Sequence, residues 1–460
     1  MDLQRTRERL ALLLIALLPF HAFAVTVGTK LIAGPGHAPL TALSVWKEIL
    51  LLVILSLSLI EAVRLKMENG KWKITDLRID LIDLLIVLLG VLALTVSYFQ
   101  SSIFNLQFLY GFKYDFTPLI AFLILRRVPW SEQFAAHVKT VLLSVGAIVS
   151  AYAIISLWLP QSVFTMLGYS DLHSLYVSHG PLAAFQQIEG LPIHRAQSTF
   201  SGPNQFGLWL LLPLGFIIVS VFNKQLSAFS FQLLGVLIVI SIFLSMSRAA
   251  VLSAGVMIAV FLASQRPFRR CVPLALSLLC ITIVLLFAIH TYAPGILLRA
   301  TSTRGHIARP LEAVRLIAAH PFGRGLGTAG PASNRTSDTC VYLPGGSDIS
   351  WAEDRPELCV FVDDVQMQPE APCSCPLLPE NWYLQIGIEM GVLGLVLYLL
   401  LILLVLQELR ITHHELQSTY LAFLGISIAA LFLHAWEDSA VAYSVWILVA
   451  STLTSPRAKI

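Results

Sequence analysis

The sequence is a succession of apolar stretches, each long enough or nearly long enough to cross a membrane as one helix. A hydrocarbon core about 30 Å thick requires roughly 20 helical residues. Only 12% of the 460 residues are charged and 57% are hydrophobic, whereas a soluble domain carries about 25% charged residues. The sequence therefore predicts an all-α polytopic membrane protein with about twelve transmembrane helices, at residues 9–27, 44–63, 80–98, 106–125, 137–159, 204–222, 230–246, 250–264, 271–290, 382–407, 418–434 and 437–454.

The first apolar stretch resembles a secretory signal peptide. Arg5, Arg7 and Arg9 precede the run Leu10–Leu18, and the small residues of Ala22-Phe23-Ala24 would suit a cleavage site. We predict that the stretch is retained as a helix, because twelve spans then balance the charges on the two sides of the membrane.

The distribution of basic residues predicts the orientation. If the amino terminus is cytoplasmic, the inner loops carry the excess of Lys and Arg that is typical of cytoplasmic loops. These loops hold Arg64, Lys66, Lys71, Lys73, Arg78, Arg126, Arg127, Lys224, Arg266, Arg269, Arg270, Arg410, Arg457 and Lys459. The formal net charge of +3 is too small and too dispersed to indicate a nucleic-acid partner.

This orientation divides the chain into five parts. They are N-terminal transmembrane helices (1–159), an extracytoplasmic segment (160–203), central transmembrane helices (204–290), a large extracytoplasmic loop (291–381) and C-terminal transmembrane helices (382–460). Every basic residue of the outer segments from Arg195 onward is Arg, and Lys is missing there. Arg offers a planar fork for two contacts with phosphate or carboxylate, so this bias favours an anionic ligand over a merely solvated surface.

Four of the six cysteines lie in the large loop: Cys340, Cys359, Cys373 and Cys375. An oxidising compartment outside the membrane permits disulfides, and we predict two. Three pairings are possible, and a bridge between Cys373 and Cys375 is disfavoured because one intervening residue leaves little room for disulfide geometry. A metal site is the competing interpretation, but Cys-x-Cys without a neighbouring His is weak support for it.

Three arginines stand at predicted span boundaries: Arg195, Arg248 and Arg304. Each one alone is explained equally well as an interfacial side chain that reaches the lipid headgroups. Three on one side of the membrane favour a shared anionic ligand. Arg304 precedes a predicted surface helix, residues 309–319, whose apolar face is formed by Leu311, Val314 and Ala318.

The order of these motifs resembles the O-antigen ligase and polymerase family over about residues 195–395. The resemblance rests on Arg195 with Gly202-Pro203-Asn204-Gln205-Phe206-Gly207, on Ser-x-Ser-Arg at Arg248, on Arg304, on His320-Pro321-Phe322-Gly323-Arg324-Gly325-Leu326-Gly327, and on Glu380-Asn381-Trp382-Tyr383-Leu384 with Glu389 and Gly391.

The resemblance implies a GT-C-like fold in the bacterial inner (plasma) membrane and an inverting, metal-independent glycosyltransferase without a cofactor. It would move a glycan from an undecaprenyl-diphosphate donor to a hydroxyl of a glycan or lipid A core acceptor on the extracytoplasmic side. Arg195, Arg248 and Arg304 would hold the diphosphate of that donor.

The sequence departs from the family at the expected catalytic His, whose place is taken by Glu380. A carboxylate can also accept a proton from a sugar hydroxyl, so Glu380 is our candidate general base. The competing interpretation is a carboxylate that interacts with the dipole of the following helix. Tyr383, His306 and His320 are possible substrate contacts, and the two histidines are also alternative bases.

No Asp-x-Asp pair of the kind that holds a metal for nucleotide-sugar donors is found in the outer segments, and Asp363-Asp364 is interpreted as a solvated turn. The alternative function is a transporter or flippase for a lipid-linked anionic glycan. Twelve spans suit that function too, but transporter sites tend to lie at mid-membrane between two related halves. Here the charged residues gather on one side.

Overall fold

The structure is a computed structural model that describes residues 2–68, 79–100, 105–170, 180–187, 194–222, 228–264, 300–343, 345–353, 355, 358–411 and 417–454. The described part of the chain is mostly helical. Apart from 271–290, which lies outside the described residues, every predicted span coincides with a helix or a helical run. The helices are α1 (Leu3–Leu17), η1 (Leu18–Phe20), α2 (His21–Ala33), α3 (Thr41–Ser44), α4 (Trp46–Glu68), α5 (Leu81–Gln100), α6 (Leu106–Leu125), α7 (Glu132–Ser156), α8 (Gln161–Met166), α9 (Pro203–Phe222), α10 (Ala228–Leu244), α11 (Arg248–Ser264), α14 (Ala300–Ala319), α15 (Gly330–Asn334), η4 (Ser350–Ala352), α16 (Trp382–Ile411), α17 (Gln417–Ala429) and α18 (Ser439–Thr454).

Six helical runs among the described residues are long and apolar enough to cross a membrane: Leu3–Ala33, Leu81–Gln100, Leu106–Leu125, Glu132–Ser156, Pro203–Val221 and Trp382–Arg410. Four apolar helices are shorter, at Gln232–Leu244, Arg248–Ser264, Ser418–Ala429 and Ser439–Thr454. Helix α4 is long but carries Lys47, Glu48 and Glu61. The chain therefore has the composition of a helical membrane protein, and the number of twelve spans stays a prediction.

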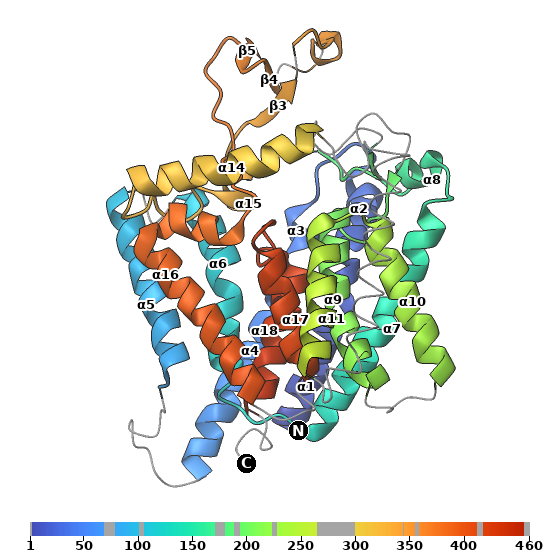
Figure 1. Ribbon diagram of the computed structural model, residues 1–460, viewed down its shortest axis with the longest axis vertical. Coiled ribbons are helices and arrows are strands. Elements are labelled where there is room, and N and C mark those ends of the chain that lie inside the picture. Colours follow the sequence, from blue (N-terminus) through green and yellow to red (C-terminus); the bar gives the residue numbers. More distant parts are fainter. Residues whose placement is uncertain are drawn as a thin grey trace.

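The helices form a bundle with two unlike ends (Figure 1). Helix α16 packs on α5, α17 packs on α9 and α11, and α18 packs on α6, so the C-terminal helices join the two halves of the bundle. Helix α14 lies across one end of the bundle, and both chain termini lie at the opposite end. Termini at one end of a bundle are what an even number of crossings requires.

Helix α1 is tied into the bundle by polar contacts as well as apolar ones. The buried Arg7 pairs with Glu61 of α4, with 2.8 Å between Nε and Oε2, and its guanidinium lies 4.2 Å from the ring centroid of Trp130. The neighbouring Glu8 accepts hydrogen bonds from the backbone N–H and the hydroxyl of Ser131. A cation at membrane depth is stabilised by such partners.

The prediction of an all-α fold is wrong for the outer segments. Residues 291–381 contain a three-stranded sheet of β3 (Thr339–Leu343), β4 (Leu358–Val362) and β5 (Val365–Gln368), in the order β3-β4-β5, with β3 parallel and β5 antiparallel to β4. The short strands β1 (Gln186–Gln187) and β2 (His194–Arg195) pair near the second half of the other outer segment. Windows of about 20 residues detect long apolar helices, and they average out strands of five residues.

Two disulfides join the sheet to the chain that follows it. Cys340 of β3 is bonded to Cys375, and Cys359 of β4 is bonded to Cys373. Of the pairings that the sequence left open, this one connects each strand to the segment after β5. The residues between Asp338 and Cys375 thus form one cross-linked unit, which we call the sheet module (residues 338–375).

Helix α14 differs from the predicted surface helix in its start and in its buried face. It begins at Ala300, and Ala313 and Ile317 are its buried side chains, in a cluster with Ala329 and Ile388. The predicted face is wrong, since Leu311 and Val314 are exposed. The small Ala313 allows α14 to approach α16 closely, and the larger apolar side chains are left on the surface at this end of the bundle.

Candidate functional site

Glu380 lies directly before α16, at the end of the bundle that carries α14. Its φ of 51° is in the left-handed region, which places a turn between the sheet module and the helix. The N-terminal cap of α16 is the next residue, Asn381, whose Oδ1 accepts from the N–H of Leu384 at 3.0 Å. Since Asn381 caps the helix, the side chain of Glu380 is not needed for that purpose.

An ion pair holds the side chain of Glu380. Its Oε1 is bonded to Nη1 of Arg309 on α14, and the side chains of Glu380 and Arg309 are 22% and 44% exposed. The carboxylate is therefore reachable from outside the bundle while its position is fixed. The sequence analysis counted Arg309 only as the start of a surface helix, and did not connect it with Glu380.

A histidine missed by the sequence analysis lies beside this ion pair. His434 is in the turn between α17 and α18, and its Nδ1 is 2.7 Å from Oε1 of Gln385. Burial lowers the pKa of His434 to about 4; Glu380 opposes this shift and Arg309 adds to it. His434 was missed because it lies 54 positions after Glu380, and no local motif connects the two residues.

The hydrogen-bond chain continues inward from His434. Nε2 of Gln385 donates to Oε1 of Glu437 at 2.7 Å. Burial raises the pKa of Glu437 well above its usual range, and the charge of Asp115 adds to this effect. The site thus consists of a partly exposed carboxylate, a neutral imidazole and a buried carboxyl group, connected through one amide.

Backbone hydrogen bonds fix Glu380 and His434 relative to one another. The N–H of Trp382 donates to the carbonyl of Ala430 at 2.9 Å, and Nδ2 of Asn381 donates to the carbonyl of Leu431 at 2.8 Å. The start of α16 is therefore attached to the turn that carries His434, and the two candidate proton acceptors share one rigid support.

The segment from His320 to Ala329, which we call the arm (residues 320–329), fits into a break in α16. Gly391, with φ of 72°, interrupts the helix. The N–H groups of Arg324 and Gly325 donate to the carbonyls of Ile388 and Glu389, both at 2.9 Å, and the N–H of Val392 donates to Pro321 at 3.0 Å. The arm thus supplies partners for backbone groups that an unbroken helix would satisfy internally.

Buried carboxyl groups lie beneath the arm. Oε1 of Glu389 accepts from the N–H groups of Gly327 at 2.9 Å and Ala329 at 3.4 Å. Asp115 of α6 lies close enough to interact electrostatically with both Glu389 and Glu437. The three acids are buried, and ionisable groups at this depth are unusual enough to indicate a function or a tightly specified packing.

An apolar groove of about 730 Å³ lies beside the arm, between the ends of α5 and α16. Its lining includes Leu92 and Val96 of α5, Phe322 of the arm, and Met390 and Val396 of α16. The side chain of Phe322 is 80% exposed. The groove has the shape and chemistry to receive part of a hydrocarbon chain.

The structure brings Arg195 close to the helix that begins with Arg248. Nε of Arg195 donates to the carbonyl of Ser245 at 3.0 Å, in the turn directly before Arg248, and its Nη2 donates to Oδ1 of Asn204 at 2.8 Å. Arg195 is nearly buried and Arg248 is exposed. The side chains of Arg304 and His306 lie outside the described residues, although their backbone belongs to α14.

The other two predicted contacts are separated by the structure. His320 is exposed and follows the C-terminus of α14, with its N–H donating to the carbonyl of Leu316 at 2.8 Å. Tyr383 is buried, and its hydroxyl donates to the carbonyl of Ser427 at 2.7 Å. Because the hydroxyl is engaged between α16 and α17, the interpretation of Tyr383 as a substrate contact is wrong.

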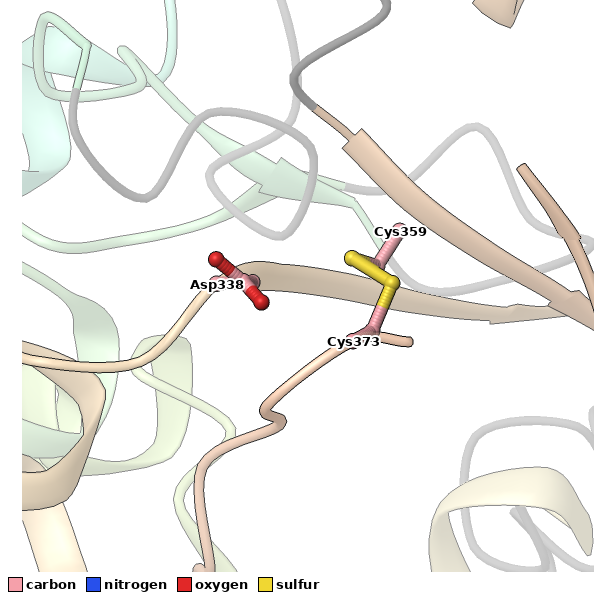
Figure 2. Close-up of side chains that lie close together, drawn as sticks. All are labelled: Asp338, Cys359 and Cys373. Atoms are coloured by element: carbon pink, nitrogen blue, oxygen red, sulfur yellow. A yellow bond between two sulfur atoms is a disulfide. The ribbon is translucent and has the colours of Figure 1, made fainter. Parts of the chain in front are cut away.

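One cluster in the described part of the chain has the residue types of a metal site: Asp338, Cys359 and Cys373 (Figure 2). The two sulfur atoms are bonded to each other, so neither is a thiolate. Oδ2 of Asp338 accepts from the N–H of Ser374 at 2.7 Å. These atoms are therefore engaged in the sheet module, and a metal ion would need the disulfide to be reduced. Asp363 and Asp364 form the exposed turn between β4 and β5, as predicted from the sequence.

No protein-family model and no curated protein matches this chain.

Proposed function

We propose that the protein is a membrane glycosyltransferase that moves a glycan from a polyprenyl-diphosphate donor, of the undecaprenyl type, to a hydroxyl acceptor such as a glycan or lipid A core. The observation that carries this proposal is the position of Glu380. It is a partly exposed carboxylate, fixed by Arg309 and placed next to His434, at an end of a membrane bundle that also carries an apolar groove.

Each part of the donor would meet a suitable group. Arg195 and Arg248, with Arg304 as predicted from the sequence, would stabilise the negative charge that develops on the departing diphosphate. The groove beside Phe322 would receive part of the prenyl chain. Glu380 would take the proton of the attacking hydroxyl, while the oxygen forms a bond to the anomeric carbon and the bond to diphosphate breaks with its electron pair on the phosphate.

Replacement of Glu380 tests the catalytic role. Glu380→Gln keeps the size of the side chain and removes proton acceptance, so turnover should fall by roughly 10²–10⁴-fold while donor binding persists. The assay is transfer from a synthetic polyprenyl-diphosphate glycan by the full chain in lipid nanodiscs. Glu370→Gln, at an exposed acid of the sheet module, is the matched control and should be silent. Wild-type turnover of Glu380→Gln would eliminate Glu380 as the base.

Replacement of Arg248 tests the diphosphate site. Arg248→Ala should weaken donor binding and slow transfer together, and Arg248→Lys should recover only part of both, because the fork geometry is lost. Arg335→Ala, at an exposed arginine of the same outer side, is the control. Unchanged donor affinity in Arg248→Ala would remove this residue from the site.

The proposal places the site on the extracytoplasmic side of a bacterial inner membrane. In a background without native cysteines, a cysteine at position 353 should react with an impermeant thiol reagent added from outside, and one at position 71 should not. The reverse labelling would contradict this orientation and, with it, an extracytoplasmic donor.

The second candidate function is a proton-coupled transporter or flippase for a lipid-linked anionic glycan. Buried Asp115, Glu389 and Glu437 favour it, since buried acids in membrane proteins are typical of proton pathways. Translocation of a fluorescent lipid diphosphate that responds to a pH gradient, without glycan transfer, would support this candidate over the first. Glu389→Gln should then abolish the response to the gradient.

A further inference from the structure

The orientation of the His434 imidazole is determined by its hydrogen-bond partners. The amide nitrogen of Gln385 donates to Glu437, so the amide oxygen faces Nδ1 of His434 as an acceptor. Nδ1 must then carry the proton, and Nε2 presents a lone pair. This is the tautomer that a proton acceptor needs.

Nε2 of His434 is shielded from solvent and has no hydrogen-bond partner among the described residues. A buried acceptor without a partner destabilises a fold by about 1–3 kcal/mol, and such groups in native structures often serve a function. The charged side chains that influence this imidazole are Glu380 and Arg309. The free lone pair therefore lies beside the candidate base.

We propose that His434 is the proton-accepting partner of Glu380, and that Gln385 and Glu437 are positioning residues for its imidazole. This inference rests on the proposed glycosyl transfer. Glu380 takes the proton as the O–H bond of the acceptor breaks, and the resulting carboxylic acid then passes that proton to Nε2 of His434. Glu380 is returned to the carboxylate form while the donor still covers the site.

The proton affinities of the two groups are compatible with this transfer. The pKa of His434 is lowered to about 4 by burial, which is close to the reference value of about 4.3 for a glutamic acid. An imidazole with its ordinary pKa near 6.5 would hold the proton and slow its release. The hydrogen bond to Gln385 and the burial of the ring thus act together to keep Nε2 able to accept and release a proton.

The other titratable groups around His434 are oriented away from Nε2 or are neutralised. Arg309 is paired with Glu380, and Glu437 is bonded to Gln385. Oδ1 of Asp438 accepts from the N–H groups of Ala440 and Val441 at the start of α18. Asp115 and Glu389 act on this group only through Glu437.

The test compares the pH dependence of transfer in wild type and in His434→Gln. Relay requires both an ionised Glu380 and a neutral His434, so lowering the pH removes activity by protonating two groups. The acid limb of log kcat should rise with a slope of about two in wild type and about one in His434→Gln, and kcat should fall by roughly 10²-fold with little change in donor KM. His137→Gln, at an exposed histidine of α7, is the control.

Two outcomes would overturn the relay: an unchanged kcat and pH profile in His434→Gln, or a loss of kcat without a change in the slope. If this variant does not accumulate, Glu437→Gln, which keeps the shape of the positioning residue, is judged by the same criteria, with a smaller loss of kcat expected. Absence of transfer by the wild-type chain would instead contradict the proposed function.

Discussion

The arm and the sheet module belong to the same outer segment, but they are held in the structure by different means. The arm is held by the bundle, through backbone hydrogen bonds to the break in α16 and through the buried carboxyl group of Glu389. The sheet module is held by itself. Its apolar cluster is small, with Ala352, Leu358 and Val360 as its buried members, and two disulfides cross-link it.

This difference teaches where covalent cross-links are needed. A unit of fewer than 40 residues buries too little apolar surface to be stable alone, and disulfides are the usual compensation outside the cell. The arm needs none, because the bundle is already folded around it. Breaking one attachment should therefore leave the other intact, and the predictions below test this independence from the largest expected effect to the smallest.

The largest effect is expected from a side chain at Gly327 in the arm. Its φ is 77°, and a Cβ there would lie 2.0 Å from the backbone oxygen of Gln107 on α6. Gly327→Ala should therefore destabilise the bundle by about 4 kcal/mol or more, as the sum of backbone strain and overpacking. Thermal unfolding of purified protein in detergent measures this loss.

Gly255→Ala in α11 is the control for Gly327→Ala, since nothing lies within 4 Å of a Cβ at position 255. The disulfides of the sheet module should still form in Gly327→Ala. Equal unfolding temperatures for the two alanine variants would show that the arm is not wedged between α6 and α16.

Removal of the disulfides should produce the next largest effect, confined to the sheet module. The chain-entropy relation gives about 4 kcal/mol for the Cys340–Cys375 bridge, which closes 35 residues, and about 3 kcal/mol for the Cys359–Cys373 bridge, which closes 14. Hydrogen exchange should rise at β3–β5 in paired Cys→Ser variants and stay unchanged in residues 320–329. Increased exchange in the arm would contradict the independence of the two attachments.

A smaller effect is expected at Glu389, where two substitutions separate hydrogen bonding from charge. Glu389→Gln keeps an oxygen acceptor for the N–H groups of Gly327 and Ala329, so it should cost under about 1.5 kcal/mol. Glu389→Ala leaves both donors unsatisfied next to a cavity and should cost about 3 kcal/mol. Denaturant unfolding of the two variants gives the difference. A larger loss in the Gln variant would indicate that the charge of Glu389 is the stabilising element.

The smallest effect is expected at the turn of the sheet module. Asp363 and Asp364 have φ of 48° and 63°, the backbone of a two-residue hairpin turn in which Gly is favoured at the second position. Asp364→Gly should therefore stabilise the module by a few tenths of a kcal/mol up to about 1 kcal/mol. The reduction midpoint of the disulfides would report this change, and a lower resistance to reduction would contradict it.

Hydropathy predicted the helices well because each apolar run records its own burial. Residues 106–125 coincide with α6, although Lys113 and Asp115 interrupt the apolar pattern. The strands of the sheet module were missed, but Leu358-Cys359-Val360-Phe361-Val362 followed by two Asp residues is a strand and turn signal of the right composition. A search for short β-branched runs would have found it.

The site was only partly predictable for a physical reason. Glu380 and the arginines stand next to span boundaries, where a charged residue is conspicuous in the sequence. His434 and Glu437 are brought to Glu380 by the packing of α17 and α18, and Gln385 connects them across about 50 positions. Contacts of this range are set by the fold, and a single sequence does not record them.

The break at Gly391 gives α16 the mechanics of a crank. Because Pro321, Arg324 and Gly325 are bonded on both sides of the break, the arm and the first part of α16 must rotate together. Helix α14 leads directly into the arm, and its Arg309 grips Glu380 at the other end of the same piece. A load that tilts α14 at the membrane surface should therefore turn the Glu380 carboxylate as well, so that the lipid surroundings of one surface helix adjust the aim of the site.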